Sequence, residues 1–202
     1  MATLSDTKRD AILAAADRMF SRYGYSKVTM GAIAEAAPVS KPTLYNYFED
    51  KSGLFGAVVA RQCQDLLVRM SRVEAATGSL REDLLQLARA VVDLSYAAST
   101  LRLFRLVIAE REAFPELGVL AYQSGAEPVL KGVARVLKKT AQAHGLTLGK
   151  PERSARMLLG LLMGEEHLRC LFGLKQGLSV AEKSRLVCES VDFYLRAHGM
   201  QT

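Results

Sequence analysis

The chain of 202 residues contains no tryptophan, five prolines and only three cysteines. Cys63, Cys170 and Cys188 are odd in number and show no C-x-x-C spacing, which argues against a disulfide framework and against a zinc site. We expect them to be buried thiols that fill space in a core and have no reactive role. The fold must therefore be stabilised by a hydrophobic core and not by covalent or metal cross-links.

Long apolar segments are also absent. The longest apolar run, Met157 to Gly164, is far shorter than the roughly 20 residues that a membrane-spanning helix needs. The segment from Met1 to Asp10 lacks the apolar stretch that a secretion signal contains. We therefore expect a cytoplasmic protein that has no membrane partner.

The sequence also lacks strand patterns. No segment alternates apolar and polar residues with the period of two that a half-buried strand requires. Apolar residues instead recur at intervals of three and four, which is typical of amphipathic helices. Half of the residues are hydrophobic, enough to form a sizeable core. The predicted fold class is all-α, and helices are expected over residues 7–23, 30–37, 41–48, 51–77, 80–98, 101–112, 116–123, 127–144, 151–173 and 180–198.

The net charge of +6 is compatible with a nucleic-acid partner but does not identify one. Residues 1–52 contain seven Lys and Arg against six Asp and Glu, and residues 53–202 contain twenty against fifteen. The excess of positive charge is therefore spread along the chain. DNA binding has to be inferred from particular positions, where phosphate contacts supply much of the affinity.

Two short helices near the amino terminus have the spacing of a helix-turn-helix. The pattern places one helix over Met30–Ala36 and the next over Lys41–Phe48, separated by a turn at Pro38-Val39. At about 100° per residue, Leu44 and Phe48 share the buried side of the second helix. The opposite side is then free to enter the major groove of DNA.

That exposed side carries residue types suited to reading DNA. Asn46 can form a bidentate contact with adenine, and a thymine methyl group can contact Pro42 or Thr43. Longer donors at the flanks can reach phosphates, and Lys41 and Lys51 lie near helix starts, where anions are favoured. The alternative is that Tyr45 and Tyr47 only cover a small core. The predicted DNA-binding residues are Thr29, Lys41, Pro42, Thr43, Tyr45, Asn46, Tyr47 and Lys51.

These positions resemble the DNA-binding signature of the TetR family of transcriptional regulators, over about residues 8–56. The matching pattern is Thr29-x-x-x-Ile33-Ala34-x-x-Ala37-x-Val39-Ser40-x-x-x-Leu44-Tyr45-x-Tyr47-Phe48-x-x-Lys51-x-x-Leu54. The resemblance implies phosphate contacts from the positions of Tyr45, Tyr47, Lys51 and Thr29. The family often has glycine where this chain has Pro38 and Pro42, so no operator sequence can be inferred from it.

The second half of the chain resembles the carboxy-terminal domain of the AefR-like branch of that family. The similarity lies in Leu103–Glu110, then Phe114-Pro115-Glu116-Leu117, and Tyr122. It implies a homodimeric regulator, most often a repressor, that binds a palindromic DNA operator and is released by a small hydrophobic or amphipathic effector. The expected domains are 1–53 for DNA binding and 54–202 for effector binding and dimerisation, connected by a helix over 54–77.

The expected dimer interface lies on the last two long helices. The resemblance places dimer contacts there, and apolar residues cover most of the circumference of the helix over 151–173, which requires cover on more than one side. Gly160 and Gly164 would let another helix approach closely. The predicted interface residues are Leu161, Gly164, Leu168, Val187, Val191 and Tyr194. The alternative is that both sides are covered within one chain.

Effector contacts are expected among residues 80–172, where apolar bulk occurs beside isolated polar groups. The candidates are Tyr96, Phe104, Glu110, Tyr122, Met163 and His167. No catalytic residue, metal ligand or cofactor is predicted, because no nucleophile, phosphate-binding or H-E-x-x-H motif occurs. Two alternatives stay open at this point: a DNA-binding regulator without a ligand, and an all-helical enzyme or metal-binding protein.

Overall fold

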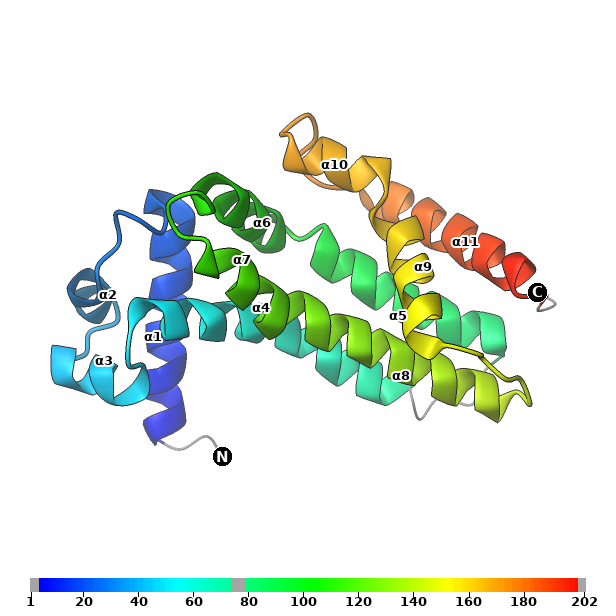
Figure 1. Ribbon diagram of the computed structural model, residues 1–202, viewed down its shortest axis with the longest axis horizontal. Coiled ribbons are helices and arrows are strands. Elements are labelled where there is room, and N and C mark those ends of the chain that lie inside the picture. The colour runs from blue at the N-terminus through cyan, green and yellow to red at the C-terminus, as the bar shows by residue number, and fades with distance from the viewer. Residues whose placement is uncertain (1–3, 74–78, 200–202) are drawn as a thin grey trace. The chain divides into compact units, whose positions relative to one another are not determined.

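The computed structural model describes residues 4–73 and 79–199, and within these ranges it contains helices and no strand (Figure 1). The predicted all-α fold is confirmed. The helix expected over 54–77 corresponds to the later part of α4 (Lys51–Val73). The expected end of this helix at residue 77 lies outside the described residues.

The backbone divides into two compact units. The first contains the described residues up to Gln62 together with Arg102–Ala126, and the second contains Cys63–Leu101 and the described residues from Glu127 onward. This grouping describes packing alone. The functional division into residues 1–53 and 54–202 stays a prediction.

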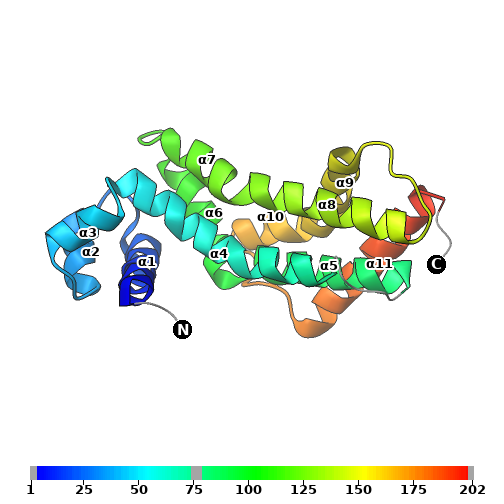
Figure 2. The same cartoon turned by 90° about the horizontal axis from the view of Figure 1, so that it is seen from below.

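The first unit is built around α1 (Leu4–Tyr23), the start of α4, and a later segment of the chain. The short helices α2 (Met30–Ala36) and α3 (Lys41–Tyr47) lie beside α1 in both views (Figures 1 and 2). The later segment supplies most of α6 (Ala98–Glu110), together with α7 (Glu116–Ala121) and the π-helix η1 (Tyr122–Ala126). Its Leu117 is fully buried in the same core as Ile12, Ile33, Leu44, Leu54 and Phe55.

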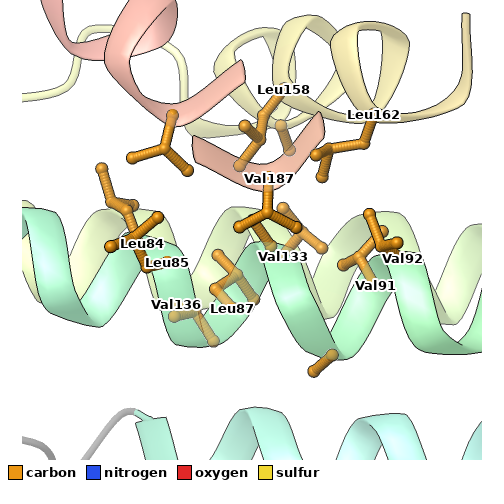
Figure 3. Close-up of a cluster of buried hydrophobic side chains, with 14 of the residues drawn as sticks. Leu84, Leu85, Leu87, Val91, Val92, Val133, Val136, Leu158, Leu162 and Val187 are labelled. Carbon is orange, nitrogen blue, oxygen red and sulfur yellow. The ribbon is translucent and has the colours of Figure 1, made fainter. Parts of the chain in front are cut away.

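The second unit is a helix bundle. It contains α5 (Leu80–Ser95), α8 (Glu127–Ala143), α9 (Pro151–Met163), α10 (Glu165–Leu171) and α11 (Val180–Ala197). Helix α5 packs against α8, α9 and α11, and α8 packs against α9. Figure 3 shows the interdigitated side chains of this core, which include Leu87 and Val91 of α5, Val133 of α8, Leu158 of α9 and Val187 of α11.

Nearby capping residues define where several helices begin, and one helix differs from the sequence prediction. Ser179 forms a capping box with Glu182 at the start of α11, and Ser79 forms another with Glu82 at the start of α5. The single helix expected over residues 151–173 is wrong, because the backbone leaves helical geometry at Gly164 and divides it into α9 and α10. Glycine is a poor helix former, and the apolar pattern alone did not locate the break.

The three thiols differ in burial. Cys170 is buried as expected, whereas Cys63 and Cys188 are only partly buried. Burial raises the pKa of the Cys63 thiol, so it stays protonated and unreactive at neutral pH. Among the described residues no three His, Cys, Asp or Glu side chains are placed to hold a metal ion. None of the described helices has the length and apolar character needed to cross a membrane.

We expect the stability contributed by Glu182 to depend on pH. Lys175 donates a hydrogen bond of 2.7 Å to its carboxylate, and Ser179 donates from its backbone nitrogen at 2.7 Å; these contacts lower the pKa of Glu182 from 4.5 to about 2. A depressed pKa in the folded state stabilises the protein above the unfolded-state pKa, and this contribution is lost as pH falls through the folded-state value. Glu182→Gln should therefore lower the melting temperature at pH 7, and the difference should narrow from about pH 4.5 towards pH 2. A difference that does not change over this range would contradict this assignment.

Candidate nucleic-acid interface

The first helix of the predicted motif, α2, begins where its sequence predicts. Thr29 has extended backbone geometry, and its hydroxyl accepts a hydrogen bond of 3.2 Å from the Ala32 backbone nitrogen. Met30, Ile33 and Ala34 face the core. Thr29 is exposed, so its side chain is accessible at the amino-terminal end of α2, where backbone N–H groups favour an anion.

The turn after α2 is fixed by two backbone hydrogen bonds. The Ala37 nitrogen donates to the Ile33 carbonyl at 2.9 Å, and the Val39 nitrogen donates to the Ala34 carbonyl at 3.0 Å. Ser40 then caps α3 by accepting a bond of 3.2 Å from the Thr43 nitrogen. A turn of this length between two short helices is that of a helix-turn-helix.

Helix α3 is attached to the core by one side. Leu44 is fully buried and is the only buried residue within the seven residues of α3; Phe48, directly after the helix, is also buried. Arg9 of α1 lies 5.7 Å from the centroid of the Phe48 ring. An isolated helix of seven residues is not stable in water, so this docking is what keeps α3 formed.

The opposite side of α3 is exposed and accessible to DNA. Tyr45 is 52% exposed, and Lys41, Pro42 and Asn46 are exposed as well. Thr43 is half-buried, and its hydroxyl is hydrogen-bonded to Ser40 at 2.8 Å. Most of the predicted DNA-binding residues therefore lie on the one short helix α3.

Tyr47 and Lys51 are less exposed than the other predicted DNA-binding residues. Tyr47 is half-buried beside the Phe48 ring, with a centroid distance of 6.5 Å. The Lys51 ammonium donates hydrogen bonds to the carbonyls of Tyr25 at 3.0 Å and Val28 at 3.1 Å. Burial lowers the pKa of Lys51, and the carboxylates of Glu110 and Glu116 oppose that shift. Two of the three N–H donors of the Lys51 ammonium group are therefore bound to backbone carbonyls of the protein.

The predicted effector residues are divided between the two units. Phe104, Glu110 and Tyr122 belong to the first unit, where Phe104 and Tyr122 are exposed. Glu110 accepts hydrogen bonds from Ser26.

The other three effector candidates, Tyr96, Met163 and His167, belong to the second unit. The Tyr96 hydroxyl donates to the Leu162 carbonyl at 3.1 Å, and its ring lies edge-on to the His167 ring at 5.4 Å. Burial raises the pKa of Tyr96 to about 12 and lowers that of His167, so both groups are neutral at pH 7. They form a polar pair inside a helical core.

The predicted dimer residues differ in how much surface they offer. Val187, Val191 and Tyr194 are buried within one chain, so they have almost no area left for a partner. Leu161 is partly buried, and Gly164 and Leu168 are exposed.

The surface of α9 and α11 contains an apolar depression of about 260 Å³. Its lining includes Met157 and Phe193, which are 48% and 55% exposed, and the complete set is Met157, Gly160, Leu161, Phe193, Tyr194, Ala197 and His198. Sequence reasoning did not select Met157, Phe193 or Ala197. The apolar pairs Met157/Leu161 and Phe193/Ala197, each four residues apart on a helix, were the signal that could have found them.

Family models match both parts of the chain. A model for bacterial regulatory proteins of the tetR family matches residues 12–58. A model for the carboxy-terminal domain of AefR-like transcriptional repressors matches residues 82–200. The first match covers the helix-turn-helix, and the second covers more than half of the chain.

Solved structures and a curated relative agree with these matches. A protein of Mesorhizobium loti MAFF303099 that is assigned to the TetR-family transcriptional regulators has a TM-score of 0.82 and 31% identity, covering 97% of this chain and 98% of that one. The flavonoid-responsive regulator FrrA has a TM-score of 0.73 and 30% identity, covering 94% and 96%. The HTH-type transcriptional regulator YhgD of Bacillus subtilis is 22% identical over 163 residues, or 78% of this chain and 82% of its own.

A tight turn followed by a docked helix with an exposed polar face defines a helix-turn-helix protein that binds DNA in a sequence-specific manner. Together with the matches to both halves, it identifies a transcriptional regulator. The chain belongs to the TetR family of bacterial transcriptional regulators, as its sequence pattern predicts. Members of this family bind DNA operators and form dimers.

Proposed function

We propose that this regulator is a homodimeric repressor that reads an inverted-repeat operator with α3 and leaves it when a small hydrophobic or amphipathic effector binds. The exposed polar face of α3, attached to the core through Leu44, is the observation that carries the DNA-binding part. The match to AefR-like repressors over residues 82–200 supports repression.

In this proposal the residues of α3 divide into two groups. Asn46 forms a bidentate contact with an adenine, and Pro42 and Thr43 contact a thymine methyl group. Phosphate contacts position the helix without reading sequence. The proposed phosphate contacts come from Thr29, Lys41, Tyr45, Tyr47 and Lys51.

The apolar depression on α9 and α11 is the proposed dimer interface. Apolar side chains at a twofold interface are covered by the same residues of the second subunit. A Cβ atom added at Gly160 would have no neighbour within 4 Å, so a partner helix has room to approach there. Two subunits would then place their α3 helices in major grooves one helical turn apart, about 34 to 36 Å.

Effector control is proposed from the relationship to FrrA, whose name describes a regulator that responds to flavonoids. The Tyr96 and His167 pair offers ring surface and polar groups inside the second unit. An effector can only release DNA if it binds the non-DNA-binding conformation more tightly. A compound that raises the melting temperature of the protein and also releases the operator would be identified as the effector. A compound that raises the melting temperature without releasing the operator would not control this regulator.

Selection of bound sites from random duplex DNA, repeated at two salt concentrations, tests the proposal. An inverted repeat with half-sites one helical turn apart is the expected result. Recovery of no motif, with binding that disappears as salt rises, would mean that only backbone attraction remains. That result would overturn the proposed reading of an operator.

Asn46→Ala should change sequence preference, and Tyr45→Phe should not. The first substitution removes a bidentate contact, which is worth about 1–3 kcal/mol of discrimination between bases. The second removes only a hydroxyl that is proposed to reach a phosphate, so it should weaken binding to all sequences by a similar factor. Competition binding against all single-base variants of the selected operator measures both. An unchanged ranking of sites for Asn46→Ala would remove Asn46 from the reading face.

A further inference from the structure

The turn between α1 and α2 is contacted by side chains from two distant segments of the chain. It begins at Gly24, which has a φ of +83° and ends α1, and it reaches Val28, whose nitrogen donates to the Tyr25 carbonyl at 3.3 Å. Thr29, which caps α2, follows directly. Any displacement of this turn therefore moves the amino-terminal end of α2.

Glu110, the last residue of α6, contacts the turn through a single carboxylate oxygen. Oε1 accepts a hydrogen bond from the Ser26 nitrogen at 3.2 Å and another from the Ser26 hydroxyl at 3.1 Å. A Cβ atom at Gly24 would lie 2.9 Å from the same oxygen. Glycine at position 24 therefore provides both the left-handed backbone and the space that the carboxylate occupies.

A second set of contacts comes from α4 and from the segment that follows α6. The Lys51 ammonium donates to the carbonyls of Tyr25 and Val28 and lies 4.2 Å from the centroid of the Tyr25 ring. The Phe114 ring packs edge-on against Tyr25 at 5.1 Å. The turn thus has its backbone N–H at Ser26 and its carbonyls at Tyr25 and Val28 all bound by side chains far away in sequence.

Helices α2 and α3 depend on this turn for their position. Each has seven residues, too few to be stable alone, and α2 packs directly against α1 and α3. Hydrogen bonds to an ionised group are about twice as strong as those between neutral groups, and they have defined geometry. The carboxylate of Glu110 is therefore well suited to fix where α2 starts.

We propose that Glu110 is a positioning residue for operator recognition: its carboxylate holds the turn at residues 24–28 so that α2 and α3 meet the operator in the correct geometry. Glu110 acts without touching DNA. The inference rests on the proposed reading of DNA by α3, and it assigns this residue a role different from the effector contact expected from sequence.

The direction of the change in DNA affinity distinguishes a positioning role of Glu110 from a purely electrostatic effect of its negative charge. Removing a negative charge from a DNA-binding unit should strengthen attraction to the phosphate backbone and so tighten binding to any DNA. Loss of a positioning contact should instead weaken binding to the operator and leave non-specific binding unchanged or slightly tighter. Glu110 is also unable to form a phosphate contact itself, so its loss should not reduce the salt dependence of binding.

The experiment compares Glu110→Ala, Glu110→Gln and the control Glu112→Ala in the full-length protein. Glu112 is exposed two residues further on, and its nearest ion-pair partner is the adjacent Arg111 at 3.9 Å. Dissociation constants are measured on the selected operator and on random duplex DNA at several salt concentrations, and thermal unfolding is followed in parallel.

Glu110→Ala should weaken operator binding by about tenfold, the size expected for losing hydrogen bonds to a charged group. Random duplex should be bound as well as by the wild type, and the slope of log K against log salt should stay the same. Glu110→Gln should restore part of the operator affinity, because its amide oxygen can still accept from Ser26, although a neutral hydrogen bond is about half as strong as one to a carboxylate. Glu112→Ala should match the wild type on the operator.

Three results would overturn the positioning role. They are equal operator affinity for Glu110→Ala and Glu112→Ala, a parallel loss on operator and random DNA that follows thermal unfolding, and no recovery with Glu110→Gln. If the wild type itself selects no inverted repeat, the proposed function fails first. A wild type that selects an operator, combined with any of the three results, removes the role of Glu110 alone.

Discussion

Leu44→Ala is expected to weaken sequence-specific DNA binding strongly, although Leu44 itself is buried and cannot reach DNA. Leu44 is fully buried and is the only buried residue within α3. Replacing a buried leucine by alanine costs about 2–5 kcal/mol, because transfer energy is lost and a cavity remains. Helix α3 is too short to be stable without its contact to the core, so much of this free energy is lost from the docking of α3. Operator affinity should therefore drop by about thirtyfold or more.

Urea unfolding and operator titration of the same samples check this prediction, with Asn46→Ala as the matched control. Asn46 lies on the same helix and is exposed, and alanine is a good helix former, so its stability should stay within about 0.5 kcal/mol of the wild type. Loss of stability should therefore occur in Leu44→Ala alone. Unchanged stability and operator affinity in Leu44→Ala would show that other contacts hold α3 in place.

Phe193→Glu is expected to produce a monomer that binds the operator weakly. Phe193 is 55% exposed in one chain and lines the apolar depression on α9 and α11, so the substitution should not unfold the protomer. In the proposed dimer the carboxylate would be buried without a partner, at a cost of several kcal/mol. Dimerisation should weaken by about a hundredfold or more, and operator affinity should fall with it because each half-site is then bound alone.

Sedimentation equilibrium at micromolar concentration measures the first effect, and titration of full and half operators measures the second. Val68→Glu is the control, because Val68 is an exposed apolar residue of α4 that does not line the depression. This variant should behave as a dimer. If Phe193→Glu is also a dimer at this concentration, the subunits associate through a different surface.

The helix-turn-helix could be predicted from sequence because its determinants are local. The Thr29 cap, the Ser40 cap and the angular position of Leu44 each depend on residues within one or two turns of helix. Side-chain periodicity therefore identified both the buried and the exposed sides of α3 before its surroundings were known. The capping box of Ser179 and Glu182 is equally local, because its two residues are three positions apart.

The roles of Glu110 and Lys51 could not be predicted in this way. Glu110 and Ser26 are 84 residues apart, and Lys51 is 23 residues from Val28, so no periodic pattern connects them. Glu110 was grouped with Tyr96 because both combine a polar group with apolar neighbours, yet they belong to different units. Val187 and Val191 were assigned to a dimer interface because the family resemblance places contacts on the last helix, and that resemblance does not distinguish the face of α11 covered by α5 from the face left exposed.

The first unit is discontinuous in sequence, and this affects how hybrid regulators should be designed. Its core includes Leu117, and its α1–α2 turn is contacted by Glu110 and Phe114, all of which come from the segment 102–126. A chimera that transfers only residues 1–62 onto another family member would replace these partners with unrelated side chains. Because these two segments pack as one unit, we expect that residues up to 62 and residues 102–126 have to be exchanged together to change operator choice.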